Sequence, residues 1–303
     1  MTDLSESDSS HDPDMHGAVP RPARDISWSS IHAPDKQSIL FQYKQVHLAE
    51  GTGRLEEMTA LKGTLSFLLT AAWAEIFPNR HLIIDHAYLD GLFCYANDHL
   101  GTTEADCEEL TVRMQEWLNS AEISNELLLS FKPREDVCHA FVQRRDFCKM
   151  AVMKAWRVDP VPIIQFREHW DYRVAPMSVN IERLCSFRLD ACHFGMLLRV
   201  PTLRVPHTVP LELLRQPKLF RVQRKAENFG ERLHCGQVGQ INAHIFNKTF
   251  QQLIWVSEAN HEKQMAELAA SIVSQTPQKR IICIAGPSSS GKTTFAYRLG
   301  VHL

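Results

Sequence analysis

A phosphate-binding motif close to the C-terminal end of the sequence places the strongest constraint on the fold. Residues 286–293 read Gly-Pro-Ser-Ser-Ser-Gly-Lys-Thr and fit the pattern Gly-x-x-x-x-Gly-Lys-Ser/Thr. In such a loop the glycines let consecutive amides point at a phosphate, the lysine reaches the β and γ phosphates, and the threonine hydroxyl ligates magnesium. The pattern predicts a site for ATP and Mg²⁺ in which Lys292 is catalytic and Thr293 holds the metal. The predicted nucleotide-binding residues are Gly286, Pro287, Ser288, Ser289, Ser290, Gly291, Lys292, Thr293 and Thr294.

The residues on either side of the motif occur in the order that a nucleotide-binding loop requires. Residues 281–285 are all apolar, as expected of a strand buried in a parallel sheet. After the loop, Phe295, Leu299 and Leu303 recur every four residues, which predicts the apolar face of a helix that Thr294 helps to start. This context favours a phosphate site over a Ser/Gly turn that binds nothing.

A complete P-loop domain needs more than these elements. It contains further parallel strands, a carboxylate that organises magnesium or accepts the substrate proton, and usually an arginine near the transferred phosphoryl group. We therefore expect residues 279–303 to be the incomplete start of a P-loop nucleotide-binding domain in a truncated chain, with little catalysis by this chain alone. A permuted order, completed by earlier residues, is disfavoured because residues before 280 do not read as a series of strand-helix units.

Hydrophobic periodicity predicts an α+β region upstream of the motif. Apolar residues recur at helical spacing over 61–77, and Pro78 follows the end of this helix. Residues 81–86 and 92–95 read as two strands of a hairpin that turns at Asp90-Gly91. Helix and hairpin together indicate a compact α+β arrangement.

Two further helices are predicted from caps and apolar stripes. Thr103 and Asp106 form a capping box at the start of one of them. The other connects the two halves of the chain over 258–275, with Ser257 as its cap, inside a boundary segment at 256–278. The apolar stripes are Cys107, Leu110, Met114, Trp117 and Leu118 in the first helix, and Met265, Leu268, Ala269, Ile272 and Val273 in the second.

Composition limits the partners and the location. The formal net charge of −2 gives no global attraction to nucleic acid or to an anionic membrane, and no apolar run is long enough to cross a bilayer. The eight cysteines include no Cys-x-x-Cys pair, so neither a cysteine zinc site nor a disulfide framework is expected, and the cytoplasm is the expected location. Residues 1–50, rich in Ser, Asp and Pro, are expected to form a disordered acidic tail without a targeting signal.

Two weaker patterns leave alternatives open. Basic residues with interleaved Phe220 and Phe229 are typical of an RNA contact, but nearby glutamates dilute the charge, so a solvated helix face is favoured. His86, with Asp85 and Asp90, could line a pocket, although a hydrogen-bonded structural histidine is favoured. The basic residues are Arg215, Lys218, Arg221, Arg224, Lys225 and Arg232, and the glutamates are Glu212, Glu227 and Glu231.

Several segments resemble a known family. Residues 65–69, 76–78, 84–86 and 90–94 resemble the second additional domain of threonyl-tRNA synthetases, and more closely the copy of that domain fused ahead of a kinase in the uridine kinase/phosphoribulokinase-like family. The resemblance runs through roughly residues 61–303 and is thin between 120 and 180. The later segments that carry it are 194–201, 217–220, 238–242, 257–263 and 284–295 with Arg298-Leu299, of which 284–295 is the most specific.

The resemblance implies a fold and an activity. It implies a synthetase-like α+β region at 51–255, a connecting helix at 256–278 and the first strand-loop-helix unit of an α/β P-loop kinase domain at 279–303. It also implies transfer of the ATP γ-phosphoryl group to a nucleoside-type hydroxyl. A P-loop ATPase or GTPase is disfavoured because Pro-Ser-Ser-Ser within the loop resembles the kinases.

The sequence departs from the synthetase pattern at one important place. The synthetase domain carries a His-x-x-x-His pair that hydrolyses mischarged tRNA, and the matching positions here are Phe67 and Ala71. Neither side chain binds a metal or moves a proton, so editing is not expected. The alternative to a kinase is a non-catalytic module that binds RNA or a protein and carries a vestigial P-loop.

Overall fold

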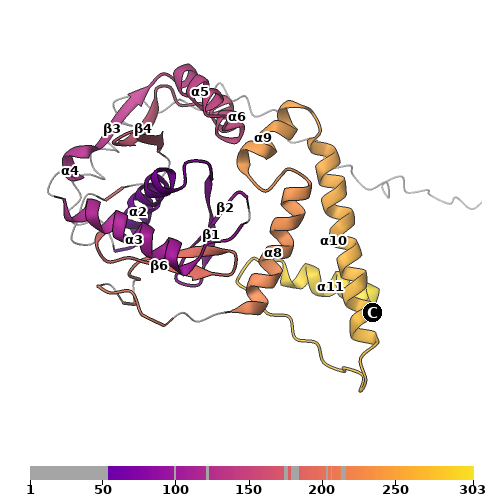
Figure 1. Cartoon of the computed structure of the whole chain (residues 1–303). Coiled ribbons are helices and arrows are strands. Elements are labelled where there is room, and N and C mark those ends of the chain that lie inside the picture. The colour runs from indigo at the N-terminus through magenta and orange to yellow at the C-terminus, as the bar shows by residue number, and fades with distance from the viewer. Residues whose placement is uncertain are drawn as a thin grey trace, which may run out of the picture. The chain divides into compact units, whose positions relative to one another are not determined.

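The computed structural model describes residues 54–98, 100–120, 123–173, 177–178, 184–202, 204–205, 207–212 and 216–303. These residues belong to one compact unit of mixed α+β structure with two small antiparallel sheets (Figure 1). The predicted α+β class is therefore confirmed, whereas the predicted tail at 1–50 lies outside the described residues. No helix in the described ranges is both long enough and apolar enough to span a bilayer.

The first sheet, sheet A, has the strand order β1-β2-β7-β6, with every neighbouring pair antiparallel. Because successive side chains on a strand point to opposite faces, the sheet divides its apolar residues between two clusters. Met196 and Leu198 of β7 join the main core, whereas Leu197 joins an aromatic cluster on the other face. The strands are β1 (Leu82–Tyr88), β2 (Gly91–Ala96), β6 (Arg188–Cys192) and β7 (Gly195–Arg199).

Two long helices supply the main core. Helix α2 (Arg54–Ile76) packs on β1, and α3 (Glu104–Asn119) packs on α2 and β6. Both predicted helices are confirmed, and α2 starts earlier than the predicted residue 61. The Thr103 hydroxyl accepts from the Asp106 amide at 3.1 Å and the Asp106 carboxylate accepts from the Thr103 amide at 2.7 Å, so the predicted capping box is present. The five apolar residues predicted for this helix are all buried: Cys107, Leu110, Met114, Trp117 and Leu118.

The hairpin is confirmed with its turn one residue earlier than predicted. Tyr88 pairs with Gly91, so Leu89 and Asp90 form the two-residue turn, and Leu89 adopts a φ of 55°. Gly91 already belongs to β2, where an added Cβ would lie 2.8 Å from the Leu198 carbonyl oxygen. Because β7 approaches this closely, a residue with a side chain would not fit at position 91 without a shift of the backbone.

A buried arginine joins the turn to the far side of sheet A. The Arg199 side chain is 1% exposed. It donates to Asp90 at 2.8 Å and 2.9 Å, to Asp190 at 3.0 Å and to the Glu212 carbonyl at 3.1 Å. Since a buried charge is tolerated only when it is paired and hydrogen-bonded, these partners account for its position.

The second sheet, sheet B, has the order β3-β4-β5, with antiparallel pairs. Ile164 and Phe166 of β4 enter the main core, while Val161 and Ile163 pack in a smaller cluster with α5 and α6. The two sheets thus share one core. The elements are α4 (Ile123–Glu126), β3 (Leu127–Lys132), α5 (Arg134–Gln143), α6 (Phe147–Ala155), β4 (Val161–Phe166) and β5 (His169–Tyr172).

The C-terminal part of the chain is helical. It contains α8 (Pro217–Arg232), α9 (Val238–Phe246), α10 (Phe250–Val273) and α11 (Lys292–His302). The predicted connecting helix exists as α10, but its predicted start at Glu258 is wrong, because no Gly or Pro interrupts residues 250–257. Ser257 is therefore not a cap: it lies inside α10 and its hydroxyl donates to the Leu253 carbonyl at 2.8 Å.

The strand predicted at 281–285 is absent from the structure. These residues have no regular secondary structure, and Ile281 is 84% exposed. A strand is stabilised by hydrogen bonds to a neighbour, and no described strand of either sheet pairs with this segment. The apolar run is therefore extended chain without a ladder, and of its residues Ile284 packs against the cluster between α10 and α11.

Candidate functional site

The loop at 286–291 makes a tight turn before α11. Ser289 has a φ of 59° and Gly291 a φ of 77°. At Gly286, an added Cβ would lie 2.9 Å from the Ser290 hydroxyl oxygen. Left-handed backbone is one reason for glycine in a phosphate-binding turn, and Gly291 shows it. The contact at Gly286 is with a side-chain hydroxyl that can move aside.

The first turn of α11 keeps its amide groups available. Gly291 is the N-cap residue and makes no side-chain capping bond. The first intrahelical bond that follows is from the Phe295 amide to the Gly291 carbonyl at 2.9 Å. Because the leading amides of a helix lack intrahelical partners, those of Lys292, Thr293 and Thr294 form a positive end suited to an anion.

The Lys292 side chain folds back over the loop. Its ammonium group donates to the Pro287 carbonyl at 2.5 Å. A lysine in the first turn of a helix opposes the positive end of the helix dipole, so this position is unfavourable unless an anion lies nearby. This hydrogen bond places the ammonium group of Lys292, the predicted catalytic residue, against the backbone of the loop.

Helix α11 is held against α10 by a small apolar cluster and a charged group. Leu299 packs with Met265 and Ala269, and all three are buried. Glu262 accepts from Arg298 and lies 2.7 Å from His302 Nε2. The hydrogen bond with His302, together with Arg298, holds the pKa of the Glu262 carboxyl below its usual value.

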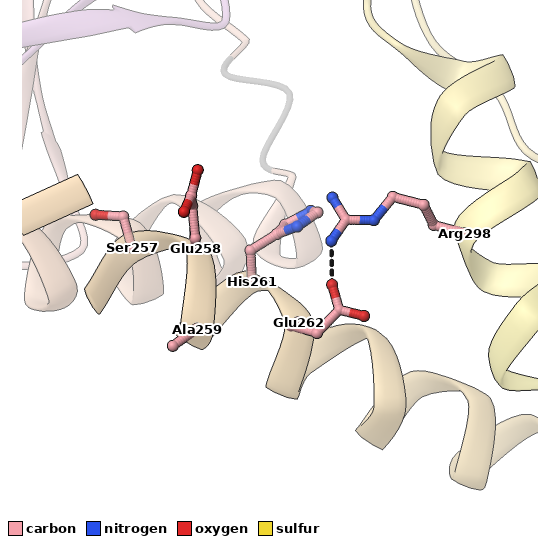
Figure 2. Close-up of a pocket in the computed structure, with 6 residues that line it drawn as sticks. All are labelled: Ser257, Glu258, Ala259, His261, Glu262 and Arg298. Carbon is pink, nitrogen blue, oxygen red and sulfur yellow. Dashed lines mark hydrogen bonds and ion pairs between the residues drawn. The ribbon is translucent and has the colours of Figure 1, made fainter. Parts of the chain in front are cut away.

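A hollow of about 540 Å³ opens beside this charged group. Figure 2 shows Arg298 reaching from α11 toward Glu262 on α10, with His261 on the same side. The guanidinium pairs with Glu262, which adds a charged contact between α11 and α10. Sequence reasoning missed Glu262 as an anchor of the loop helix, because its partners are 36 and 40 residues away along the chain. The lining residues are Ser257, Glu258, Ala259, His261, Glu262 and Arg298.

The structure separates the residues of the predicted basic cluster. Phe220 packs in the aromatic cluster of sheet A and stacks on His193, with ring centroids 3.3 Å apart. Arg224 turns inward, pairs with Glu227 at 3.3 Å and lies over the Phe194 ring. The described cations that remain exposed are Lys218, Arg221, Lys225 and Arg232, while Arg215 lies outside the described residues.

The histidine that was expected near Asp90 has a different neighbour. Asp90 binds Arg199, whereas His86 Nδ1 lies 2.8 Å from Asp85 and 3.6 Å from Glu227. Burial, more than the proximity of Asp85, raises the pKa of Glu227. From the sequence, Glu227 is interpreted only as a residue that lowers the net positive charge of the basic cluster, because no local pattern links it to His86.

Phe67 and Ala71, which stand at the positions of the synthetase histidines, are both buried in the main core. Comparison with protein-family models and with curated proteins found no match to this chain.

Proposed function

We propose that residues 286–293 bind the phosphates of ATP with Mg²⁺, and that this is a uridine kinase-like protein. In this proposal the γ-phosphoryl group passes to a nucleoside-type hydroxyl. The loop amides cradle the phosphates, Lys292 neutralises developing charge and Thr293 ligates the metal. The parallel strands that would pair with residues 281–285, the base and the acceptor pocket are required for full activity.

The observation that carries this proposal is the position of Lys292. Its ammonium group lies over the loop against a backbone carbonyl, at the uncapped start of α11. A phosphate would replace that carbonyl as its partner and would also meet the free amides of the first turn. A turn that binds no anion gains no stability from a lysine in this position.

The test is equilibrium binding of a fluorescent ATP analogue to the full 303-residue chain, with and without Mg²⁺. Lys292→Ala should weaken binding about 10- to 100-fold, the equivalent of losing one charge-assisted hydrogen bond. Lys279→Ala, which removes an exposed lysine outside the loop, is the matched control. Equal affinity of the wild type and Lys292→Ala would refute a working phosphate site.

The free state of all eight cysteines fits a cytoplasmic protein, in which thiols stay reduced. We therefore propose that the protein is cytoplasmic.

A second candidate function rests on the exposed face of α8. At 100° per residue, Lys218, Arg221, Lys225 and Arg232 fall within about 60° of one another around the helix. All four are exposed, opposite the face that packs on sheet A. Such a stripe matches the phosphates of a single RNA strand.

Fluorescence anisotropy with a single-stranded RNA tests this second candidate. Binding should weaken steeply between low and physiological salt, and Arg221→Glu should weaken it further. Glu258→Gln on α10 is a control that leaves the stripe intact. Salt-independent or absent binding would dismiss this function.

A further inference from the structure

A β-bulge in β1 places two adjacent side chains on one face of sheet A. Ile84 pairs with Cys94 and His86 pairs with Phe93, so Asp85 is the extra residue. Adjacent residues on a regular strand point to opposite faces, but a bulge re-aims the residue that follows it. Asp85 and His86 therefore lie together, with His86 Nδ1 2.8 Å from Asp85 Oδ2.

Helix α8 brings a third ligand-type residue to the same point. Phe220 anchors α8 on the aromatic cluster, and Glu227 follows seven residues later on the same side of the helix. Its Oε1 lies 3.6 Å from His86 Nδ1. One imidazole nitrogen and two carboxylate oxygens, one from each residue, all lie within 4.8 Å of one another.

The hydrogen bonds around Glu227 leave part of the cluster unsatisfied. The Glu227 side chain is only 10% exposed. Arg224 donates to Oε2, but Oε1 is buried and has no hydrogen-bond partner among the described residues. Since buried polar atoms are nearly always bonded, a buried carboxylate oxygen that makes no hydrogen bond beside a histidine and a second carboxylate is suited to bind a cation.

We propose that Asp85, His86 and Glu227 bind a divalent transition-metal ion, with Zn²⁺ as the ion that suits them best. Bonds of about 2.0–2.2 Å put two ligands of one zinc ion roughly 3–4 Å apart. His86 Nδ1 lies 2.8 Å from Asp85 Oδ2 and 3.6 Å from Glu227 Oε1, so small side-chain shifts would bring the three atoms to zinc-binding distances. Two carboxylates balance the charge of the ion, and imidazole favours zinc over magnesium. Three protein ligands leave a fourth position for water.

The site would join α8 to β1 and is independent of the phosphate loop. It uses no cysteine, so it does not require the Cys-x-x-Cys pattern that the sequence lacks. Its ligands come from the bulge and from a helix 141 residues further along the chain. A bound ion would therefore stabilise the packing of α8 on sheet A.

The experiment measures Zn²⁺ binding by the full chain in competition with a chromophoric zinc indicator. The wild type should bind one ion, and Glu227→Gln and His86→Gln should weaken binding by at least about tenfold. Glu231→Gln, one helical turn after Glu227 and outside the cluster, should bind like the wild type. Equal affinity of Glu227→Gln and the wild type, or no binding by the wild type, would overturn the proposal.

Two further measurements separate this site from other causes. Co²⁺ bound in place of Zn²⁺ should show ligand-field bands without a thiolate charge-transfer band, and a thiolate band would assign the metal to cysteines and overturn the proposal. In chelator, Glu227→Gln should melt at or above the wild-type temperature, because it removes a buried carboxylate. Added Zn²⁺ should raise the melting temperature of the wild type but not of this variant, and an equal rise in both would overturn the proposal.

Discussion

Gly195 shows how one residue can decide the packing of a whole sheet. An added Cβ at this position would lie 2.2 Å from the Cys94 carbonyl oxygen of the neighbouring strand β2. Contacts below 3.0 Å force a shift of backbone, which cannot move as cheaply as a flexible side chain. The pairing of β2 with β7 therefore depends on the absence of a side chain at Gly195.

We predict that Gly195→Ala lowers the free energy of unfolding by about 1–3 kcal/mol, the usual cost of overpacking. Urea denaturation measures the change. Gly300→Ala on α11 is the control, because an added Cβ there meets nothing within 4 Å. A loss in the control as large as that in Gly195→Ala would contradict the steric explanation.

His169 predicts a specific dependence of stability on pH. Its Nε2 lies 3.3 Å from the Thr70 hydroxyl, whose proton is donated to the Phe67 carbonyl, so Nε2 must donate to Thr70. Burial lowers the pKa of His169 to about 4, whereas a histidine in the unfolded chain titrates near 6.5. Between these values the unfolded state binds more protons, so stability falls as the pH is lowered.

The expected loss from this group between pH 6.5 and 4 is about 2 kcal/mol, less than the full shift implies because the ring is partly exposed. Chemical denaturation at several pH values measures it. His169→Gln keeps the donor and removes the titration, so the pH dependence of the variant should be flatter by this amount. Parallel stability profiles for the two proteins would show the prediction to be wrong.

Helix α3 illustrates which elements are predictable from sequence. Its cap and its buried face depend on residues within one or two turns, and both are as predicted. The state of residues 281–285 depends on a neighbouring strand, and the strand predicted there was wrong. The start of α10 was also predicted wrongly, although its uninterrupted sequence from Phe250 is a local feature. Local patterns thus describe an element well when its energetics are local.

For α3 we predict that Thr103→Ala lowers the free energy of unfolding by about 1 kcal/mol, because it removes the hydroxyl that accepts from the Asp106 amide. The adjacent Thr102 is the matched control. Its buried hydroxyl has no hydrogen-bond partner among the described residues, so Thr102→Val should not destabilise the protein. Thermal or urea unfolding distinguishes the two, and equal losses would rule out a capping effect.

At the scale of the whole molecule, the apolar residues form cores of very different size. The main core joins sheet A, sheet B, α2 and α3, whereas α10 and α11 share a cluster centred on Met265, Ala269 and Leu299. Regions with few buried contacts open at lower free energy than the global transition. Helix α11, which follows the loop at 286–291, therefore belongs to the less stable part of the described structure.

Hydrogen exchange tests this difference. Amides of α11 should exchange faster than those of β2 and β7, and Leu299→Ala should accelerate α11 by at least about tenfold because it removes a buried leucine. Val301→Ala is the control, since Val301 is 86% exposed. Faster exchange in sheet A after the Leu299 change, or no change in α11, would contradict separate opening.

Contiguous residues are sufficient to predict the loop at 286–293, the amphipathic helices and the hairpin, because their geometry depends on neighbours in the chain. The tertiary structure alone shows that a bulge turns His86 toward Glu227, that Arg199 joins Asp90 to Asp190, and that residues 281–285 lack a partner strand. Each of these depends on the packing of distant segments, for which short-range periodicity carries no information. The turn at 286–291 is therefore a property of local sequence, and the proposed metal site is a property of the fold.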